Sequence, residues 1–321
     1  MQTLLNTVNQ IFTTEQFLHE PRPLYEPIDY TLRLGGKRIR PLMLLAANRM
    51  FGGIDEAVRH AAIGIEMFHN FTLLHDDLMD RSPLRRGQPT VYRKWGDNTA
   101  ILSGDTMFAL AWQYFLKQPH ERLHDILKCF NQTAIEVCEG QQYDMDFEQR
   151  NDTTLDEYMQ MIRLKTAVLL AAALKIGALY AHAPEEDTEH LYQFGIHLGL
   201  AFQLQDDLLD AYGDTATFGK QTGQDIRDRK KTYLLHCALH LANSTQQKEL
   251  QALFADVNVD EDARVVRVLQ IYKELGIQPH VEEAIRQQFA LAKEQLDAVQ
   301  VEEIQKAPLQ QLMETLLGRK K

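Results

Sequence analysis

Two long apolar segments of this chain each end in the same acidic pattern. Residues 56–79 and 194–209 are apolar on almost every side of a helix, and a helix of that kind is buried. The first ends in DDLMD at residues 76–80 and the second in DDLLD at residues 206–210. The first and last aspartates of each pentad share one face of a helix. We therefore expect two central helices whose carboxylates face each other across the mouth of a cavity.

The pentads place carboxylates where a helix does not favour them. Three carboxylates at a helix C-terminus repel one another and meet the negative end of the helix dipole. One such pattern is common on solvated helices, but two copies that each close a buried helix indicate a bound cation. Oxygen ligands suit Mg²⁺, which keeps several waters and is shared with substrate phosphates. The predicted metal-binding residues are Asp76, Asp77, Asp80, Asp206, Asp207 and Asp210.

Four groups of cationic residues are interleaved with the pentads. They are GGKRIRP at 35–41, Arg85-Arg86-Gly87, Lys165-Thr166 within LKTAVLLAAAL, and the loop FGKQTGQDIRDRKKT at 218–232. Each has an ordinary interpretation, as a solvated basic turn, surface arginines, a lysine that reaches solvent, or a polar loop. Together with two carboxylate clusters they favour anionic substrates that metals bridge to the protein, and two diphosphates fit well.

Composition excludes several other classes of protein. The net charge of −11 argues against nucleic-acid binding, which needs an electropositive surface. The three cysteines lack metal-ligand spacing and are expected to be reduced thiols, which indicates a cytoplasmic protein. The N-terminus lacks the features of a signal peptide. The apolar run Leu169–Leu174 is too short to span a bilayer, so we expect no membrane span.

Helical periodicity dominates the chain, and strand patterns are nearly absent. We predict one all-α domain over residues 1–321, a large helical bundle around a central cavity. Prolines 21, 23 and 27 are expected to break the chain early. The predicted helices span 2–18, 38–51, 56–79, 96–117, 121–147, 154–182, 186–212, 231–242, 246–256, 260–277, 279–299 and 301–317.

The motifs resemble those of a known family, the trans-type isoprenyl diphosphate synthases, or polyprenyl synthetases, which include farnesyl and geranylgeranyl diphosphate synthases. The resemblance runs from about residue 30 to residue 235. It rests on GGKRIRP, HNFTLLHDDLMDRSPLRRG, LKTA, FQLQDDLLD and GKQTGQDIRDRKKT, which occur in the family order. It implies the all-α isoprenoid synthase fold, a homodimer, and Mg²⁺, with three ions when substrate is bound. The implied reaction is head-to-tail transfer of an allylic group onto isopentenyl diphosphate.

The resemblance also implies a role for each motif residue. Asp76, Asp80 and Asp206 match positions that hold Mg²⁺ on the allylic diphosphate, and Asp77, Asp207 and Asp210 support them. The residues that match allylic-diphosphate contacts are Arg85, Lys165 and Lys220, with Lys230 near the same group. The residues that match the isopentenyl diphosphate site are Lys37, Arg40, His69 and Arg86. Thr166 and Gln203 match positions whose oxygens face the developing carbocation.

The residues before the first pentad bear on product length. Phe71 and Phe68 lie five and eight residues before Asp76, on roughly the same helix face. Either they are ordinary core aromatics, or they form the floor of the product cavity. Long-chain relatives tend to carry a small residue at the position of Phe71, so the resemblance implies a short product, C15 or C20.

Two departures from the family pattern stand out. Arg229 occupies a position where many relatives have glycine. The first pentad lacks the insertion found in many bacterial farnesyl diphosphate synthases, which argues against that specific assignment.

Two other functions remain as alternatives. A terpene cyclase shares the fold and one aspartate-rich motif, but it carries a different second metal motif and needs no isopentenyl diphosphate site. A non-catalytic subunit of a heteromeric prenyl synthase tends to lose aspartates or cations, whereas this chain keeps them.

Overall fold

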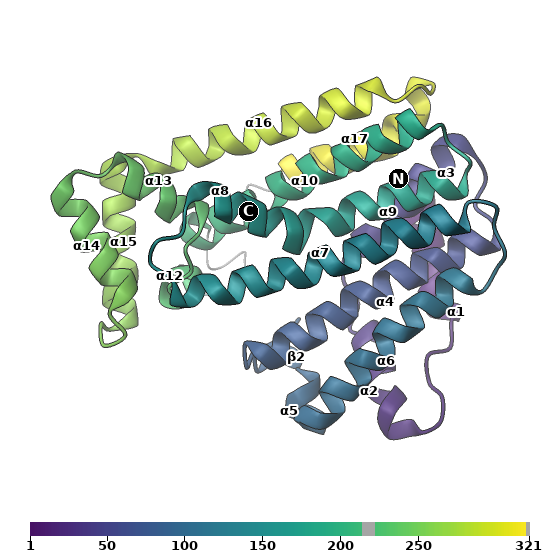
Figure 1. Cartoon of the computed structure of the whole chain (residues 1–321), viewed down its shortest axis with the longest axis horizontal. Coiled ribbons are helices and arrows are strands. Elements are labelled where there is room, and N and C mark those ends of the chain that lie inside the picture. The colour runs from purple at the N-terminus through teal and green to yellow at the C-terminus, as the bar shows by residue number, and fades with distance from the viewer. Residues whose placement is uncertain (214–221, 319–321) are drawn as a thin grey trace. The chain divides into compact units, whose positions relative to one another are not determined.

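The computed structural model describes residues 1–213 and 222–318, and Figure 1 shows the order of its elements. The chain is all-α, as predicted, with a single short hairpin among the described residues. Lys220 lies outside the described residues. The helices are α1 (Gln2–Thr14), α2 (Arg22–Arg33), α3 (Ile39–Phe51), α4 (Glu56–Met79), α5 (Val91–Trp95), α6 (Asp97–Leu116), α7 (Leu123–Gln149), α8 (Leu155–Ile162), η1 (Arg163–Ala167), α9 (Val168–Tyr180), α10 (Glu185–Tyr212), α12 (Gln224–Arg227), α13 (Tyr233–Leu241), α14 (Ser244–Ala255), α15 (Glu261–Leu275), α16 (Ile277–Ala298) and α17 (Glu303–Leu317). The hairpin strands are β1 (Leu84–Arg85) and β2 (Gln88–Pro89), which pair antiparallel.

The chain groups into two compact units. Unit 1 contains Met1–Phe130, Ala172–Glu189 and Gln300–Leu309, and unit 2 contains Asn131–Ala171, His190–Val299 and Gln310–Lys321. The prediction of a single domain stays a prediction. No helix of the described residues is long and apolar enough to cross a membrane.

Unit 1 is built around α3, α4 and α6. Asp55 caps α4 by accepting a hydrogen bond from the backbone N–H of Val58. Phe68 of α4 is fully buried and packs against Phe108 of α6, with ring centroids 5.8 Å apart. This packing explains why residues 56–79 are apolar on nearly every side, and it fixes the helix that carries the first pentad.

Unit 2 is built around residues 190–212 of α10, together with α8, α13, α15 and α16. Two histidines of α10 pair with glutamines of α16: His197 with Gln288 at 2.9 Å, and His190 with Gln295 at 2.9 Å. These two polar contacts lie two turns apart and fix how α10 lies against α16. They position the helix that carries the second pentad.

Helix α2 was not among the predicted helices. Its prolines were expected to break the chain, but Pro23 occupies the first turn, where its missing N–H has no helical partner to lose. Pro27 lies inside the helix and is buried. The strong amphipathic packing of α2 therefore outweighs the one hydrogen bond that Pro27 removes.

The predicted helix over 154–182 is not continuous. The structure divides it into α8, a π-helix and α9, and the π-helix covers Arg163–Ala167. The backbone N–H of Val168 reaches back five residues to the carbonyl of Arg163. Such single-turn π segments are frequent at functional sites. This one carries Lys165 and Thr166, two residues that the sequence analysis selected.

Arg229 has a backbone conformation that favours glycine. Its φ of 58° lies in the left-handed region, which is costly for a residue with a Cβ. Its amide donates to the carbonyl of Ile226, so the chain turns sharply after α12. The structure thus gives a physical reason why glycine suits this position.

We expect Arg229→Gly to stabilise the protein by about 0.5–1 kcal/mol, because the left-handed penalty exceeds the extra entropy that glycine has in the unfolded chain. Urea unfolding of both proteins measures the difference. Arg229→Ala is the matched control, since it removes the side chain and keeps the strained Cβ. An equal gain in Arg229→Ala would show that the arginine side chain, and not its backbone, is unfavourable.

Candidate functional site

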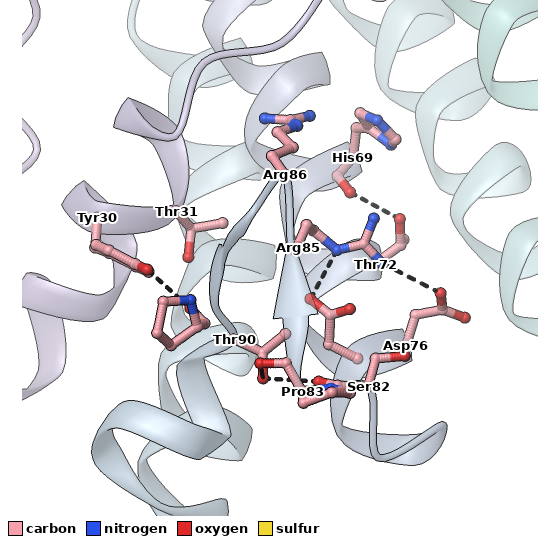
Figure 2. A network of polar contacts seen from close by, with 12 residues as sticks. Tyr30, Thr31, His69, Thr72, Asp76, Ser82, Pro83, Arg85, Arg86 and Thr90 are labelled. Carbon is pink, nitrogen blue, oxygen red and sulfur yellow. Dashed lines mark hydrogen bonds and ion pairs between the residues drawn. The ribbon is translucent and has the colours of Figure 1, made fainter. Parts of the chain in front are cut away.

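The carboxylates of the first pentad are paired with Arg85. Asp76 and Asp77 lie in the last turn of α4, and Asp80 is its C-cap. Figure 2 shows Arg85 pointing from the hairpin toward Asp76. Arg85 Nη2 lies 3.7 Å from Asp76 Oδ2, and Arg85 Nε lies 2.7 Å from Asp77 Oδ2. Burial raises the pKa of Asp77, and Arg85 opposes that shift. The cation thus reduces the cost of a buried carboxylate at the negative end of a helix.

The tight turn of the hairpin separates Arg85 from Arg86. Arg86 and Gly87 have φ of 53° and 75°, the positive values of a two-residue hairpin turn. Arg86 points away from the pentad (Figure 2) and donates a hydrogen bond from Nη1 to the carbonyl of Gly35. Gly36, with φ of 127°, has no side chain, and a Cβ there would lie 2.7 Å from the Arg86 guanidinium. The GG segment therefore cradles Arg86.

Arg40 and His69 form the second half of this basic cluster. Arg40 Nη1 lies 3.0 Å from His69 Nε2, and because arginine only donates, Nε2 is the acceptor and the proton is on Nδ1. Desolvation and the nearby arginines, Arg40 foremost, hold the pKa of His69 well below its ordinary value. Burial lowers the pKa of Arg40 to about 10. A neutral His69 thus presents an N–H beside a charged guanidinium.

A buried glutamate balances the basic cluster. Glu66 of α4 is 2% exposed and accepts from Arg38 Nη1 at 2.8 Å and from Asn70 Nδ2 at 3.1 Å. Arg38 also lies 4.3 Å from the ring of Phe12 in a cation–π contact. Arg38 therefore belongs to the support of the cluster. Nothing in the sequence distinguishes Glu66 and Asn70 from other polar residues of a buried helix.

Arg40 Nε is buried and has no hydrogen-bond partner among the described residues. A buried donor of this kind is costly unless a ligand satisfies it. Lys37 is exposed and follows Gly36, which lies against Arg86. Arg40, His69 and Arg86 therefore form a cluster in unit 1 with the composition of an anion site, and Lys37 adjoins it in the sequence.

Unit 2 contains a cavity of about 100 Å³. Five predicted residues line it, namely Lys165, Thr166, Gln203, Lys230 and Asp207 of the second pentad. Its other lining residues are Asp144, Phe147, Glu148, Tyr158, Met161, Ile162, Asp225, Lys231 and Thr232. The cavity is therefore polar and carries both signs of charge.

A chain of hydrogen bonds runs from the π-helix to the second pentad. Thr166 Oγ1 donates to Gln203 Oε1 at 3.1 Å, and Gln203 Nε2 donates to Asp207 Oδ1 at 3.0 Å. The hydroxyl of Tyr158 donates to the other oxygen of Asp207. Every donor in the chain points toward Asp207, so the lone pairs of Thr166 remain available to the cavity.

Carboxylates are crowded around the second pentad. Burial, with Asp206 nearby, raises the pKa of Asp207 to about 6, and burial with Asp207 and Asp210 raises the pKa of Asp225 to about 7. Asp210 is used differently, because its carboxylate accepts from the backbone amides of Gln224 and Asp225 at the start of α12. A cation bound here would offset the part of each pKa shift that comes from repulsion between the carboxylates.

Three lining residues that contact predicted site residues were not themselves predicted, namely Asp144, Tyr158 and Asp225. Lys165 Nζ lies 2.6 Å from Asp144 Oδ2, which the sequence placed in an ordinary helix. Asp225 lies in the loop 218–232, which was selected for its lysines, so its place in that loop could have marked it as a site residue. Tyr158 lay in a predicted helix with no pattern to mark it.

The donor chemistry fits a divalent cation that is shared with a ligand. Asp77 Oδ1 is buried and lacks a hydrogen-bond partner among the described residues. Across residues 1–213 and 222–318, no three histidine, cysteine or carboxylate side chains form a preassembled metal group. Mg²⁺ is usually bound by one or two carboxylates with substrate phosphates and water completing its shell. The pentads therefore suit a metal that arrives with a phosphate ligand.

The two phenylalanines before the first pentad belong to an aromatic cluster. Phe71 lies 5.5 Å from Phe68 and 5.4 Å from Phe108, and Phe68 lies 5.3 Å from Phe130, between ring centroids. Phe68 is fully buried, whereas Phe71 is only half-buried. The buried ring holds the core together, and the half-buried ring is the one that a ligand could reach.

Comparison with known proteins gives consistent matches. The family model "Polyprenyl synthetase" matches residues 21–273. The chain is 39% identical over 251 residues to a short chain isoprenyl diphosphate synthase of Methanocaldococcus jannaschii, covering 78% of this chain and 76% of that protein. It is 36% identical over 310 residues to a geranylfarnesyl diphosphate synthase of Natronomonas pharaonis, covering 91% and 89%. It resembles the crystal structure of a geranylgeranyl pyrophosphate synthase with a TM-score of 0.90 at 41% identity, covering 100% and 98%.

We expect Gly36→Ala to weaken the binding of inorganic diphosphate about tenfold, because the new Cβ displaces the Arg86 guanidinium and one charged hydrogen-bonding group is lost. Titration calorimetry measures the affinity. Gly35→Ala is the matched control, since Gly35 also has a positive φ of 79° but open space around its Cβ. Equal weakening by both variants would mean that backbone strain, and not Arg86, is responsible.

Proposed function

The chain belongs to the polyprenyl synthetase family, and from this premise we propose that it condenses isopentenyl diphosphate head-to-tail with an allylic diphosphate in a Mg²⁺-dependent reaction. The protein is a prenyltransferase of the trans type that makes a short-chain isoprenyl diphosphate. The observation that carries the proposal is the family match across residues 21–273, which contains both pentads and all four cationic groups. The comparisons do not favour a terpene cyclase or a non-catalytic subunit.

The basic cluster of unit 1 suits isopentenyl diphosphate. Lys37, Arg40 and Arg86 would supply charge to its phosphates, and arginine forks match phosphate oxygens in pairs. The unpartnered Nε of Arg40 and the Nδ1–H of His69 are donors ready for further oxygens. A neutral His69 also avoids adding a fourth cation where the ligand is absent.

The allylic diphosphate is assigned to the remaining cations. Arg85, Lys165 and Lys230 would contact it, and Lys220 is assigned to the same group from the family pattern alone. Arg85 and Lys165 now pair with Asp77 and Asp144. When the diphosphate binds, its oxygens would replace these carboxylates as partners of the two cations. Arg85 and Lys165 would therefore be paired with negative charge both with and without the ligand.

The pentads are assigned to the metal. Asp76, Asp80 and Asp206 would be ligands, and Asp77, Asp207 and Asp210 would support them, with three Mg²⁺ ions present when substrate is bound. When bound, Mg²⁺ neutralises the charge that develops on the departing diphosphate. The buried unpartnered oxygen of Asp77 and the crowding around Asp207 support this assignment.

The protein's own groups account for the rest of the reaction. No side-chain nucleophile is required, because ionisation of the allylic diphosphate generates the electrophile. Thr166 and Gln203 line the cavity, and their hydrogen bonds donate in the direction of Asp207. Lone pairs of their oxygens would therefore be available to stabilise a nearby carbocation. Apolar neighbours such as Met161 and Ile162 would exclude water from it.

We further propose a C15 or C20 product, a homodimer, a single domain and a cytoplasmic location. The half-buried Phe71 above Phe68 supports a short product. The cysteines, none of which is bonded to another, support a reducing compartment.

Isotope-labelled isopentenyl diphosphate, supplied with each of the C5, C10 and C15 allylic diphosphates, tests the proposed reaction. We expect label to enter longer diphosphates with Mg²⁺, to stop with a chelator and to resume when Mg²⁺ is restored. Asp76→Asn should lower kcat at least about a hundredfold, because it weakens charge stabilisation at the leaving group. Asp97→Asn, an exposed carboxylate paired with Arg81, is the matched control and should keep its activity.

Other outcomes of the same assay favour the alternatives. Hydrocarbon formed from the allylic diphosphate alone would indicate a cyclase. A folded protein without turnover would indicate a non-catalytic subunit.

We expect Phe71→Ala to lengthen the product by at least one C5 unit, because removing the ring deepens the cavity floor. Chromatography of the dephosphorylated products measures this. Phe71 is half-buried, so its loss should cost less stability than the roughly 3–5 kcal/mol expected for the buried Phe68. Phe289→Ala, a buried phenylalanine of α16, is the control for general destabilisation. Unchanged products from Phe71→Ala would place the floor elsewhere.

A further inference from the structure

We infer that Arg264 of α15 is a positioning residue, which holds α12 so that Asp225 and Lys230 lie against the unit 2 cavity. This inference deepens the proposed function and rests on it for its kinetic part. Arg264 lies in α15, outside the predicted motifs, and does not line the cavity. It is 2% exposed, one of the largest fully buried side chains of the described residues.

Backbone carbonyls surround the buried guanidinium. Nε donates to Leu253 at 2.9 Å, Nη1 to Arg227 at 3.0 Å, and Nη2 to Asp256 at 2.9 Å and Val259 at 3.2 Å. Leu253 lies in the last turn of α14, Asp256 is its C-cap, and Arg227 is the last residue of α12. Helix C-termini carry partial negative charge and favour a cation. Two helix ends therefore converge on one arginine.

This arrangement requires arginine rather than a positive charge alone. The guanidinium has a rigid, planar fork of five N–H donors, and here it reaches four carbonyls that belong to three segments. Lysine has a single compact head with three donors. It can satisfy the end of α14 or the end of α12, but it cannot span both.

The neighbours of Arg264 on α15 also hold α12. Asp262 pairs with Arg227 Nη2 at 2.7 Å. Val265 packs against Gly223, where φ is 80° and a Cβ would lie 2.7 Å from Val265 Cγ1. Asp262 thus contacts a side chain of this four-residue helix, Arg264 contacts its end, and Val265 contacts its start.

Helix α12 carries this constraint to the cavity. Its first turn is fixed by Asp210 of the second pentad, which accepts from the amides of Gln224 and Asp225. Beyond its end, the amide of Lys230 donates to the carbonyl of Asp225 at 2.8 Å, and both side chains line the cavity. A helix of four residues has little stability of its own. Its position therefore depends on these external attachments, of which Arg264 is the most buried.

Hydrogen exchange of the unliganded protein tests the attachment directly. The amides of residues 223–225 and 227–230 are hydrogen-bonded, so a peptide over this segment reports on α12. We expect Arg264→Lys to increase exchange there about tenfold, since a charged hydrogen bond is lost. Arg267→Lys is the matched control, on the same helix and paired with Glu249 of α14 at 2.5 and 2.7 Å. It should leave the segment unchanged.

The kinetic experiment tests whether a less firmly held α12 weakens substrate binding at the cavity. In Arg264→Lys, the KM for the allylic diphosphate should rise about tenfold, because Lys230 loses its fixed position, while the KM for isopentenyl diphosphate changes less than about twofold. A merely structural role would move both constants together, or neither. Such a result, or unchanged exchange at 223–230, would overturn the inference.

A second variant keeps the test decisive if Arg264→Lys does not fold. Asp262→Asn removes the exposed partner of Arg227 and leaves the core intact, so it should give a smaller increase in exchange over the same segment. No increase in Asp262→Asn would overturn the inference in that case. If the wild-type protein transfers no prenyl group, the proposed function fails, and the exchange result still decides whether Arg264 holds α12.

Discussion

The need to neutralise carboxylates at the ends of buried helices shapes the structure around both pentads. The molecule meets this need in three ways: Arg85 pairs with Asp76 and Asp77, hydroxyl and amide donors satisfy Asp207, and the start of α12 satisfies Asp210. Each solution recruits another segment, so the hairpin, α8, the π-helix and α12 are all positioned by their contacts with carboxylates. The contacts that neutralise the pentad carboxylates therefore also hold the surrounding segments in place.

These same pairs are suited to exchange. An ion pair that is partly exposed contributes little net stability, so an incoming metal and phosphate can replace it at low cost. Arg85 and Lys165 form ion pairs of this kind, because each side chain is 27% exposed. By contrast, Arg38 and Glu66 are almost completely buried and form a permanent support. Exposure thus distinguishes Arg85 and Lys165, which are proposed to bind a ligand, from Arg38, which supports the framework.

Much of the fold could be predicted from local patterns. The helix over 56–79 was predicted to the residue because its apolar pattern, cap and terminal pentad agree. Helix α2 was missed because its stability comes from packing, which outweighs its prolines. The cationic motifs identified the basic cluster of unit 1, since its members lie in recognisable segments. Asp144, Tyr158 and Arg264 could not be found in this way, because each acts through contacts with residues distant in the sequence.

The π-helix has a consequence for how this sequence can change. A π turn holds one more residue than an α turn, so residues 163–167 behave as a one-residue insertion inside a long helix. Deleting one residue there would restore regular α-helical winding and rotate everything before it by about 100° relative to α9. Tyr158 would then turn away from Asp207. The length of this segment is therefore as constrained as the identity of its residues.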